Sequence, residues 1–521
     1  MTTRILLSFL AACSAIAAFS QYPNVLIGSS NFPNEPSVMI SPKNPDIMVA
    51  GANIDIVYYS DDGGLTWQED HLDSPYGVWG DPCIIADTAG DFYYFHLSNP
   101  SNGNWIDRIV CQKSTDGGHT WSDGTYMGLN GAKAQDKEWA VVDPSNNNIY
   151  VTWSQFDNYG SSNPGDSSVI LFSRSTDGGQ TWSEAVRICK EGGDCLDSDN
   201  TVEGAVPAVG PNGEIFVSWA GPEGLIFTKS MDQGLTWPVD NTFVTAIPDG
   251  WDYAIPGIYR ANGLPVTCCD LSQGPYRGNI YINWSDQRNG PDDTDIFFIK
   301  SSDGGATWSE PLRVNDDDPG HQQFFTWMTI DQSNGDIWII FYDRREYTDK
   351  QTDVFVAVSH DGGASFTNLK VSETPFIPIA SAFFGDYTNI WASNGIVRPI
   401  WLSMDIPGPQ MSIYTAIIDS VMTGISPGRK IPASISLDQN YPNPARGMTN
   451  FSFKVHSPTE VTLKVFDVFG NVVAIPVNHS FRSPGKYIEP FDVDRAGLTP
   501  GFYYYSLLTR DQSVRRKMIV E

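Results

Sequence analysis

Short apolar runs, rich in β-branched and aromatic residues and bounded by Gly, Asn, Asp and Pro, recur along most of the chain. Clear examples are NIYINW (Asn279–Trp284), DIFFIK (Asp295–Lys300), DIWIIF (Asp336–Phe341) and DVFVAV (Asp353–Val358). Runs of this length and composition predict β-strands. A further short run precedes each such pair, as WMTID does at Trp327, and predicts an inner strand. The mature chain shows no convincing amphipathic helical period, so we expect an all-β protein.

A polar octapeptide, Ser-x-Asp-x-Gly-x-Thr-Trp, follows the last apolar run of each group. Five copies begin at Ser60, Ser114, Ser175, Ser230 and Ser301, and a degraded sixth begins at Ser359. Their central aspartates, spaced 54 to 71 residues apart, are Asp62, Asp116, Asp177, Asp232, Asp303 and Asp361. Repeats of this period indicate supersecondary units that cannot bury their apolar faces alone.

The residue types of the octapeptide are those of a tight hairpin turn. A carboxylate accepts N–H bonds from the turn that follows it, and glycine supplies positive φ. The hydroxyls tie the flanking strands, and the Trp offers a large surface to bury. We therefore interpret the six aspartates as structural.

This octapeptide resembles the Asp-box, or BNR, repeat of sialidases and related β-propellers, with Gln233 in place of the usual first glycine of one copy. The resemblance implies a propeller in which each box joins the third and fourth strands of a blade, on the face opposite the active site. It speaks for architecture more than for activity.

Three strands without a box follow the sixth copy, in Phe383–Ala392, Gly395–Ser403 and Met411–Ile418. One spare strand, Pro23–Ser30, precedes the first group. A terminal strand that completes the last sheet removes exposed edges. Three strands plus one predict a seventh blade, and six blades are the alternative.

The N-terminus has the pattern of an export signal. Arg4 precedes the apolar stretch Ile5–Phe19, and Ala18-Phe19-Ser20 resembles a cleavage site, so we expect a signal peptide over residues 1–20. A second interpretation is a lipobox ending at Cys13. No later segment reaches the roughly 20 apolar residues of a membrane span.

The C-terminal part, with alternating strands and the motif Asn440–Pro444, predicts a small β-sandwich of about 85 residues. It resembles the type A sorting domain of the type IX secretion system of Bacteroidota, which implies that secretion machinery as a partner and a secreted or surface location. An Ig-like adhesion or carbohydrate module is the alternative. The expected domains are a propeller over 21–420, a linker over 421–434 and the sorting domain over 435–521.

The formal charge of −29 and the pI near 4.4 argue against nucleic acid as a partner. Six cysteines remain after the signal; Cys189 and Cys195 are near enough in sequence to bridge, and no zinc spacing is present. The acidic runs 194–200 and 316–318 lack EF-hand spacing, so we expect no metal site and no cofactor, with calcium left open.

Carboxylates and aromatic residues recur where the inner strands begin, at the mouth of the expected central channel. They lie in NEPSV, WGDPC, DKEWA, VEGAV, FFTWM and FFGDY, and the fifth blade begins less clearly within Ile247–Arg260. Crowded carboxylates raise one another's pKa, bind cations or hydrolyse glycosides. The alternative for each is a cap on its own strand.

The resemblance to sialidases implies a Tyr nucleophile aided by a Glu, an Asp acid/base, and three arginines that bind a sugar carboxylate. By position these would be Tyr387, with Glu203 or Glu138, and Asp81. No arginine stands on the opening inner strand, EPSVMIS, which departs from the family pattern. The predicted substrate-binding residues are Arg260, Arg344, Trp79 and Trp327.

Arg288 and Arg345 stand in a repeated Asp-x-Arg motif, which favours salt bridges that hold loops. Two hypotheses about function follow from the sequence. One is a secreted, exo-acting glycosidase of sialidase-like design that acts on extracellular glycans. The other is a non-catalytic propeller that binds glycan or glycoprotein at the cell surface.

Overall fold

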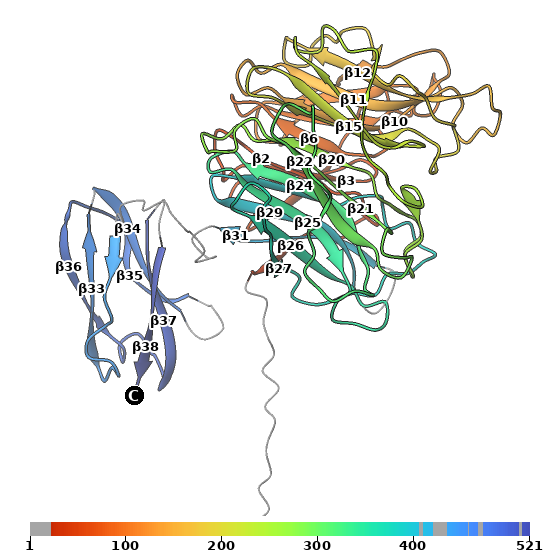
Figure 1. Ribbon diagram of the computed structural model, residues 1–521. Helices are drawn as coiled ribbons and strands as arrows, with labels where there is room; N and C mark the ends of the chain where they lie inside the picture. The colour runs from red at the N-terminus through yellow and green to blue at the C-terminus, as the bar shows by residue number, and fades with distance from the viewer. Residues whose placement is uncertain (1–21, 406–409, 420–434, 457, 467–471, 510–512) are drawn as a thin grey trace, which may run out of the picture. The chain divides into compact units, whose positions relative to one another are not determined.

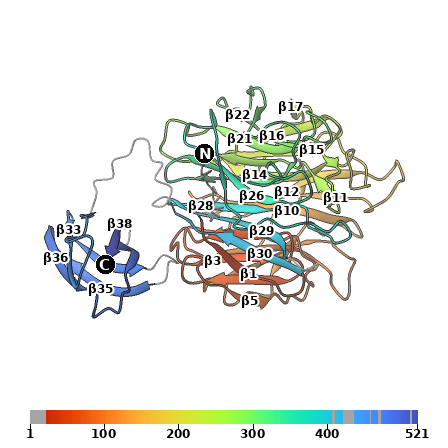
Figure 2. The ribbon, with the colours of Figure 1, turned by 90° about the horizontal axis from the view of Figure 1, so that it is seen from below.

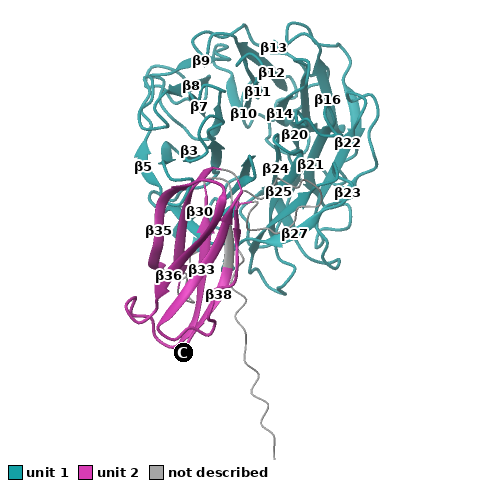
Figure 3. Ribbon diagram, turned by 90° about the vertical axis from the view of Figure 1, so that its left-hand side faces the viewer, with its two compact units in different colours: residues 1–418 teal, residues 419–521 magenta. Residues whose placement is uncertain are grey.

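The computed structural model describes residues 22–405, 410–419, 435–456, 458–466, 472–509 and 513–521 (Figure 1). The expected signal peptide and the linker 421–434 lie outside these residues. The chain divides into two compact units, residues 1–418 and 419–521, which Figure 3 colours separately. Every regular element in the described residues is a β-strand, which confirms the all-β prediction.

Among the described residues, unit 1 contains six antiparallel sheets of four strands, a seventh of five strands, and a separate two-stranded hairpin. Six of them are built from four consecutive strands, as the apolar runs predict. The first three are β2–β5 (Ser37–Ile40, Met48–Ala52, Ile56–Ser60, Gln68–His71), β6–β9 (Cys83–Ala86, Phe92–Leu97, Ile109–Ser114, Thr125–Met127) and β10–β13 (Ala134–Val142, Ile149–Phe156, Ser168–Ser175, Val186–Arg187). The next three are β14–β17 (Glu203–Val209, Ile215–Gly221, Gly224–Ser230, Thr242–Thr245), β20–β23 (Val266–Cys269, Ile280–Asp286, Asp295–Ser301, Leu312–Arg313) and β24–β27 (Gln323–Asp331, Asp336–Asp343, Asp353–Ser359, Thr367–Lys370).

The seventh sheet joins the two ends of unit 1. It holds β28 (Asn389–Ser393), β29 (Ile396–Asp405) and β30 (Gln410–Ala416), with the short β31 (Ile418–Asp419) on β29. Strand β1 (Asn24–Gly28) pairs antiparallel with β30, so that Asn24 faces Ala416. Figure 2 shows β1 beside β30. The prediction that an N-terminal strand completes the last sheet is therefore confirmed.

The first strands of neighbouring sheets contact one another in a cycle, β2–β6–β10–β14–β20–β24–β28 and back to β2. Each sheet nevertheless remains a separate hydrogen-bonded unit. In Figure 3, β10, β14, β20 and β24 face the middle of unit 1, whereas β5, β13, β23 and β27 lie at its outside.

Large aromatic side chains from the second strands fill the space between the sheets. Trp153, Trp219 and Trp284 occupy the same place in β11, β15 and β21, and each is at most 1% exposed. Each belongs to a cluster of buried side chains contributed by more than one sheet. A sheet that cannot bury its face alone is thus covered by the next one.

All six octapeptides lie between the third and fourth strands of their sheets, as expected. In the Ser175 copy, Asp177 Oδ1 accepts the Ser175 hydroxyl at 2.7 Å and the Thr181 N–H at 2.9 Å, and Asp177 Oδ2 accepts the Thr181 hydroxyl at 2.6 Å. The other five copies repeat this pattern. Because strands alternate in direction, these turns lie at the opposite end of each sheet from the start of its inner strand.

The fifth sheet corrects one prediction. Its inner strand is β20, which begins at Val266, after the expected segment Ile247–Arg260. That segment leads instead into a separate two-stranded hairpin of β18 (Asp252–Tyr253) and β19 (Ala261–Asn262). In this segment, turn residues alternate closely with aromatic residues. The apolar pattern therefore predicted the inner strand at the position of the hairpin β18–β19 instead of at β20.

Two side-chain predictions can be compared with the structure. Arg288 pairs with Asp286 at 2.5 Å and Arg345 pairs with Asp343 at 2.8 Å, so the repeated Asp-x-Arg motif does form salt bridges. The six cysteines of the described residues are free thiols, Cys189 and Cys195 included.

Unit 2 is a sandwich of two antiparallel sheets, as predicted. One sheet holds β32 (Ile435–Leu437), β33 (Met448–Val455) and β36 (Gly485–Asp492), and the other holds β34 (Thr459–Phe466), β35 (Val472–Arg482), β37 (Gly501–Leu508) and β38 (Ser513–Val520). The buried Asn440 of the Asn440–Pro444 motif donates its side-chain amide to Thr449 Oγ1 at 3.0 Å, and its backbone N–H to the Tyr505 hydroxyl at 2.6 Å. The motif is therefore anchored to the sandwich core.

Candidate functional site

Six of the seven inner strands are preceded or interrupted near their start by a residue with positive φ. These residues, with φ between 49° and 91°, are Glu35, Asp81, Lys137, Gly204, Phe325 and Gly385. In β10, β14 and β24 the residue sits in a bulge that shifts the register with the second strand. A bulge re-aims side chains at the rim of a sheet. The bulge in β10 therefore re-aims Lys137, whereas Glu35 and Asp81 adopt positive φ in the segments just before β2 and β6.

Lys137 is the centre of the polar groups at the mouth. Its ammonium group lies 2.8 Å from Asp386 Oδ2 and 3.2 Å from Asp81 Oδ2, and its side chain is 6% exposed. Lys137 lies in β10, whereas Asp81 and Asp386 lie just before β6 and β28, the inner strands of two other sheets. The surrounding carboxylates hold the pKa of Lys137 well above its usual value in spite of burial.

Arg260 forms the second bridge, from the loop before β19. Its Nε donates to Asp386 Oδ1 at 2.8 Å, a second nitrogen pairs with Asp386 Oδ2, and its third nitrogen pairs with Asp197 Oδ2 at 2.9 Å. Lys137 and Arg260 together keep the pKa of Asp386 below its usual value although its carboxylate is buried. Asp386 therefore ties the inner strands to the loop.

A chain of hydrogen bonds links the first, second and last sheets. One carboxylate oxygen of Glu35 accepts the backbone N–H of Asp386 at 3.0 Å, and the other accepts the Asn53 side-chain amide. The side-chain oxygen Oδ1 of Asn53 in turn accepts a hydrogen bond from the backbone N–H of Asp81 at 2.7 Å. Burial, and then the nearby charges of Asp81 and Asp386, raise the pKa of Glu35 well above that of a free carboxyl.

Asp136 differs from its neighbours because no cation is bound directly to it. Among the described residues, its carboxylate accepts one hydrogen bond, from the backbone N–H of Lys137 at 3.0 Å. Burial raises its pKa to about 7; Lys137 opposes this shift, and the charges of Asp81 and Asp197 add to it. Near neutral pH, Asp136 can therefore hold or release a proton.

These groups surround a pocket of about 290 Å³. Its polar lining includes Asp81, Asp136, Lys137 and Arg260, and its apolar lining is made by Ile54, Trp79, Leu97, Trp105, Ile106, Tyr159 and Phe383. Trp79 and Trp105 are 39% and 44% exposed, and their rings meet edge to face at 6.3 Å. The pocket thus combines an exposed aromatic surface with a few converging polar groups, the combination that binds and orients small ligands.

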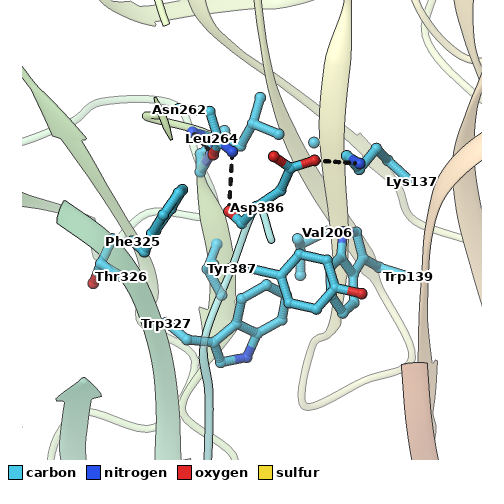
Figure 4. Close-up of a pocket in the computed structure, with 13 residues that line it drawn as sticks. Lys137, Trp139, Val206, Asn262, Leu264, Phe325, Thr326, Trp327, Asp386 and Tyr387 are labelled. Carbon is cyan, nitrogen blue, oxygen red and sulfur yellow. Dashed lines mark hydrogen bonds and ion pairs between the residues drawn. The ribbon is translucent and has the colours of Figure 1, made fainter. Parts of the chain in front are cut away.

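Beneath the polar groups, three aromatic rings fill the centre of unit 1 (Figure 4). Trp139 lies 4.2 Å from Trp327 and 4.9 Å from Tyr387, measured between ring centroids. These side chains line a second cavity of only about 20 Å³, the volume of a single water molecule. Figure 4 also shows Asp386 reaching Lys137 on one side and Asn262 through its backbone carbonyl on the other.

The four predicted catalytic residues are placed differently. Asp81 lines the large pocket. Within the described part of the chain, the Tyr387 hydroxyl and both carboxylate oxygens of Glu138 are buried without a hydrogen-bond partner, and neither side chain lines that pocket. Both carboxylate oxygens of Glu203 are buried in the same way, near Asp197, in a third cavity of about 20 Å³.

Burial decides the protonation of these three groups. It raises the pKa of Glu138, Glu203 and Tyr387 well above their usual values, with the charge of Asp81 acting next on Glu138 and Tyr387, and that of Asp197 on Glu203. A tyrosine nucleophile needs a carboxylate that accepts its proton. Among the described residues, no such hydrogen bond reaches Tyr387.

Of the four predicted substrate-binding residues, Trp79 and Arg260 line the large pocket. Trp327 belongs to the aromatic floor. Arg344 is 3% exposed and lines none of the pockets around Lys137; its guanidinium donates to the Thr352 hydroxyl at 3.0 Å and to the Pro256 carbonyl at 2.8 Å. Burial lowers its pKa to about 10.

The sequence reasoning missed Lys137, Trp105 and Asn53 as site residues. The segment DKEWA carried a usable signal for Lys137, because a lysine flanked by two acids is unusual near the start of an inner strand. Trp105 and Asn53 lie in loops between strands, and nothing in their local sequence distinguishes them from surface residues.

No cluster of three or more His, Cys, Asp or Glu side chains suited to a metal ion occurs among the described residues. None of the elements described there is a helix long and apolar enough to cross a membrane.

Comparison with known proteins identifies two parts of the chain. Residues 439–521 match the family described as secretion system C-terminal sorting domain, and residues 58–69 match the BNR/Asp-box repeat. The sorting domain directs type IX secretion to the cell surface or out of the cell, which confirms the predicted localisation. The Asp-box interpretation of the octapeptides is confirmed as well.

A curated relative is the xyloglucanase Xgh74A of Acetivibrio thermocellus, which is 23% identical over 371 residues, covering 67% of this chain. The match spans 39% of the length of that enzyme.

Among solved structures, the Hadza microbial sialidase Hz136 is 16% identical, with a TM-score of 0.39 over 73% of this chain and 74% of the sialidase. The α-L-arabinanase of Penicillium chrysogenum is 12% identical, with a TM-score of 0.41 over 78% of this chain and 98% of the arabinanase. TM-scores of this size carry no argument about activity or substrate.

Proposed function

We propose that unit 1 is a seven-bladed β-propeller which, after export by its sorting domain, hydrolyses glycosidic bonds in extracellular glycans. The cycle of contacts among the seven inner strands supports the propeller, since it places their first residues around one central mouth. The similarity of part of the chain to a xyloglucanase supports a polysaccharide or oligosaccharide as substrate.

The observation that carries the proposal is the pocket of about 290 Å³, in which Asp81 and Asp136 stand in different environments. Asp81 is ion-paired with Lys137, whereas Asp136 is without a direct cation and has a pKa of about 7. Glycoside hydrolysis requires a carboxylic acid that protonates the leaving oxygen and a carboxylate that faces the anomeric carbon. Two carboxyl groups whose environments differ can divide these roles.

In this mechanism Asp136 is the proton donor. It holds its proton at and below neutral pH and gives it to the glycosidic oxygen as the bond breaks. Asp81, held in position by Lys137, faces the positive charge that develops at the anomeric carbon. A water molecule then forms the new bond to that carbon and gives up a proton, which completes the hydrolysis. Trp79 and Trp105 present ring faces for the sugar, and the buried Glu138, Glu203 and Tyr387 support the floor and wall beneath it.

The test is hydrolysis of a panel of fluorogenic glycosides and plant and animal polysaccharides by the purified protein. We expect turnover of at least one substrate and loss of turnover in Asp136→Asn and Asp81→Asn. The melting temperature should stay unchanged in Asp136→Asn, whereas Asp81→Asn, which removes an ion-pair partner of Lys137, should melt at a lower temperature but remain folded at the assay temperature. Full activity in both variants would place the chemistry elsewhere in the molecule.

One observation favours a second function, a propeller that binds glycan or protein without catalysis. Both cations of the pocket are held by carboxylates, and Tyr387, the predicted nucleophile, lies outside the pocket with no carboxylate bound to it. Binding without turnover, across the same panel, would establish this function instead.

A further inference from the structure

The cations of the large pocket are already neutralised by the protein. Among the described residues that line it, Lys137 and Arg260 are the positively charged ones. Lys137 pairs with Asp81 and Asp386, and Arg260 pairs with Asp386 and Asp197. Three carboxylates therefore surround two cations before any ligand enters.

The net charge of the pocket is negative. Three carboxylates paired with two cations leave one negative charge. Asp136 lines the same space and adds a second negative charge where the pH rises above about 7 and it loses its proton. An anionic ligand would have to place its charge next to Asp81 and Asp136. Like charges brought together at a binding site repel one another, so the electrostatic field of this pocket opposes the binding of anions.

The apolar side of the pocket suits the face of a sugar ring. Trp79 and Trp105 expose 39% and 44% of their surface and contact each other edge to face. Trp105 also meets Tyr159 edge to face at 5.5 Å, and Tyr159 donates its hydroxyl to Asp197 at 2.6 Å. The aromatic surface is thus fixed by packing and by a hydrogen bond to one of the carboxylates that neutralise Arg260.

We propose that this pocket binds an uncharged sugar residue, stacked on Trp79 and Trp105, and rejects sugars that carry a carboxylate or a sulfate group. The inference rests on the proposed function in taking a glycan as the ligand, and it adds the class of sugar. The carboxylates that bind Lys137 and Arg260 then act as specificity-determining groups, since they occupy the cations that an acidic sugar would need.

The experiment compares matched pairs of glycans that differ only in charge. Neutral cello-oligosaccharides are compared with their C6-oxidised, glucuronate-containing counterparts, and a galactose-terminated glycan with the same glycan capped by sialic acid. Binding to the full-length secreted protein is followed by calorimetry and by tryptophan fluorescence. We expect a neutral member to bind and its acidic counterpart to bind at least about tenfold more weakly, with a ratio that shrinks as salt is added.

Two variants sharpen the measurement. Trp105→Ala should weaken binding of the neutral glycan by about tenfold, the loss expected for an aromatic contact at the centre of a site. Phe243→Ala is the matched control, because Phe243 is 57% exposed on β17 and does not line this pocket. The double variant Asp81→Asn/Asp136→Asn removes two acidic groups from the pocket lining. It should therefore reduce the ratio between the affinities for the neutral glycan and for its acidic counterpart.

The outcomes separate this inference from the proposed hydrolysis. Binding of a neutral glycan without turnover would overturn the hydrolase and leave the specificity standing. Equal or tighter binding of the acidic member, or no binding of any neutral glycan, would overturn the inference. A preference for the neutral member that Trp105→Ala leaves unchanged would also overturn it, since the sugar would then bind elsewhere.

Discussion

Aspartates serve opposite purposes at the two ends of the sheets in unit 1. In the octapeptide turns, Asp177, Asp232, Asp303 and Asp361 accept hydrogen bonds from backbone and hydroxyl groups within their own turns, and each has a pKa lowered to about 2. At the mouth, Asp136 has a pKa raised to about 7, and burial raises that of Glu203 as well.

The difference lies in where the partners come from. A turn carboxylate such as Asp177 accepts hydrogen bonds from three residues of the same chain segment, so its charged form is stabilised wherever the octapeptide occurs. A mouth carboxylate depends on side chains from other sheets, and where these are absent, desolvation favours the neutral form. Repeated and satisfied acids therefore indicate structure, and buried acids without partners are candidates for function.

The largest expected effect is a loss of turnover when Asp136, the mouth carboxyl whose pKa is raised to about 7, is replaced. Asp136→Asn removes the group that we propose as proton donor and should reduce turnover by roughly 10²–10⁴-fold while preserving the fold. In the wild type, turnover should fall as the pH rises through about 7, because Asp136 then loses its proton. The kinetics are measured from pH 5 to 9; activity that stays constant over this range would contradict the assignment.

The next effect concerns the cation at the mouth. Lys137→Met should destabilise the protein by about 3 kcal/mol or more, because it leaves the charges of Asp81 and Asp386 without one of their partners. Urea denaturation measures the change. Lys229→Met is a matched control, since Lys229 Nζ donates to a backbone carbonyl in another sheet, and it should cost much less.

A third prediction uses the sign of the pKa shift at Glu203. A carboxyl with a raised pKa in the folded state costs stability as the pH rises from its unfolded value near 4 toward its folded value. Glu203→Gln removes this cost, so the variant should gain stability over the wild type by on the order of 1 kcal/mol per pH unit across that window. Thermal melts at pH 5 and pH 8 test it; a gain that is equal at both pH values would show that Glu203 is charged in the fold.

The smallest effect is expected in a turn. Asp177→Ala should destabilise by about 1 kcal/mol, the value of modest hydrogen bonds at an exposed site, with activity per folded molecule unchanged. The pKa of Asp177 is lowered to about 2, so its contribution is present above pH 4 and is lost as the pH falls toward 2. Melting curves at pH 7 and pH 3 check both points, and lost activity without a change in melting would make Asp177 a functional residue.

Much of the fold could be predicted because its determinants are local. The octapeptides specify their own turns, and the apolar runs specify strands, so all-β structure and the completion of the last sheet by β1 follow from the sequence. The prediction failed at β20, where the hairpin β18–β19 has the same short aromatic pattern as a blade strand. Local pattern does not distinguish two kinds of strand when both are short.

The site could be predicted only as a region. The sequence placed Asp81, Tyr387 and Glu203 near the start of inner strands, and the structure brings these starts together. The sequence could not show that the Tyr387 ring packs against Trp139 beneath the pocket, or that Arg344 is held by Thr352 away from the pocket. These facts depend on which side of each strand a residue faces after the bulges shift the register.

The sequence by itself determined the turns, the strands and the sorting domain, because each rests on bonds between residues a few positions apart or on a motif that folds as a unit. Only the tertiary structure decided which acids are charged. Asp81, Lys137, Arg260 and Asp386 come from separate sheets and loops, and their ion pairs exist only once the inner strands surround one mouth. Protonation follows from burial and from the distances between those groups, and neither quantity is encoded in the neighbours of any one residue along the chain.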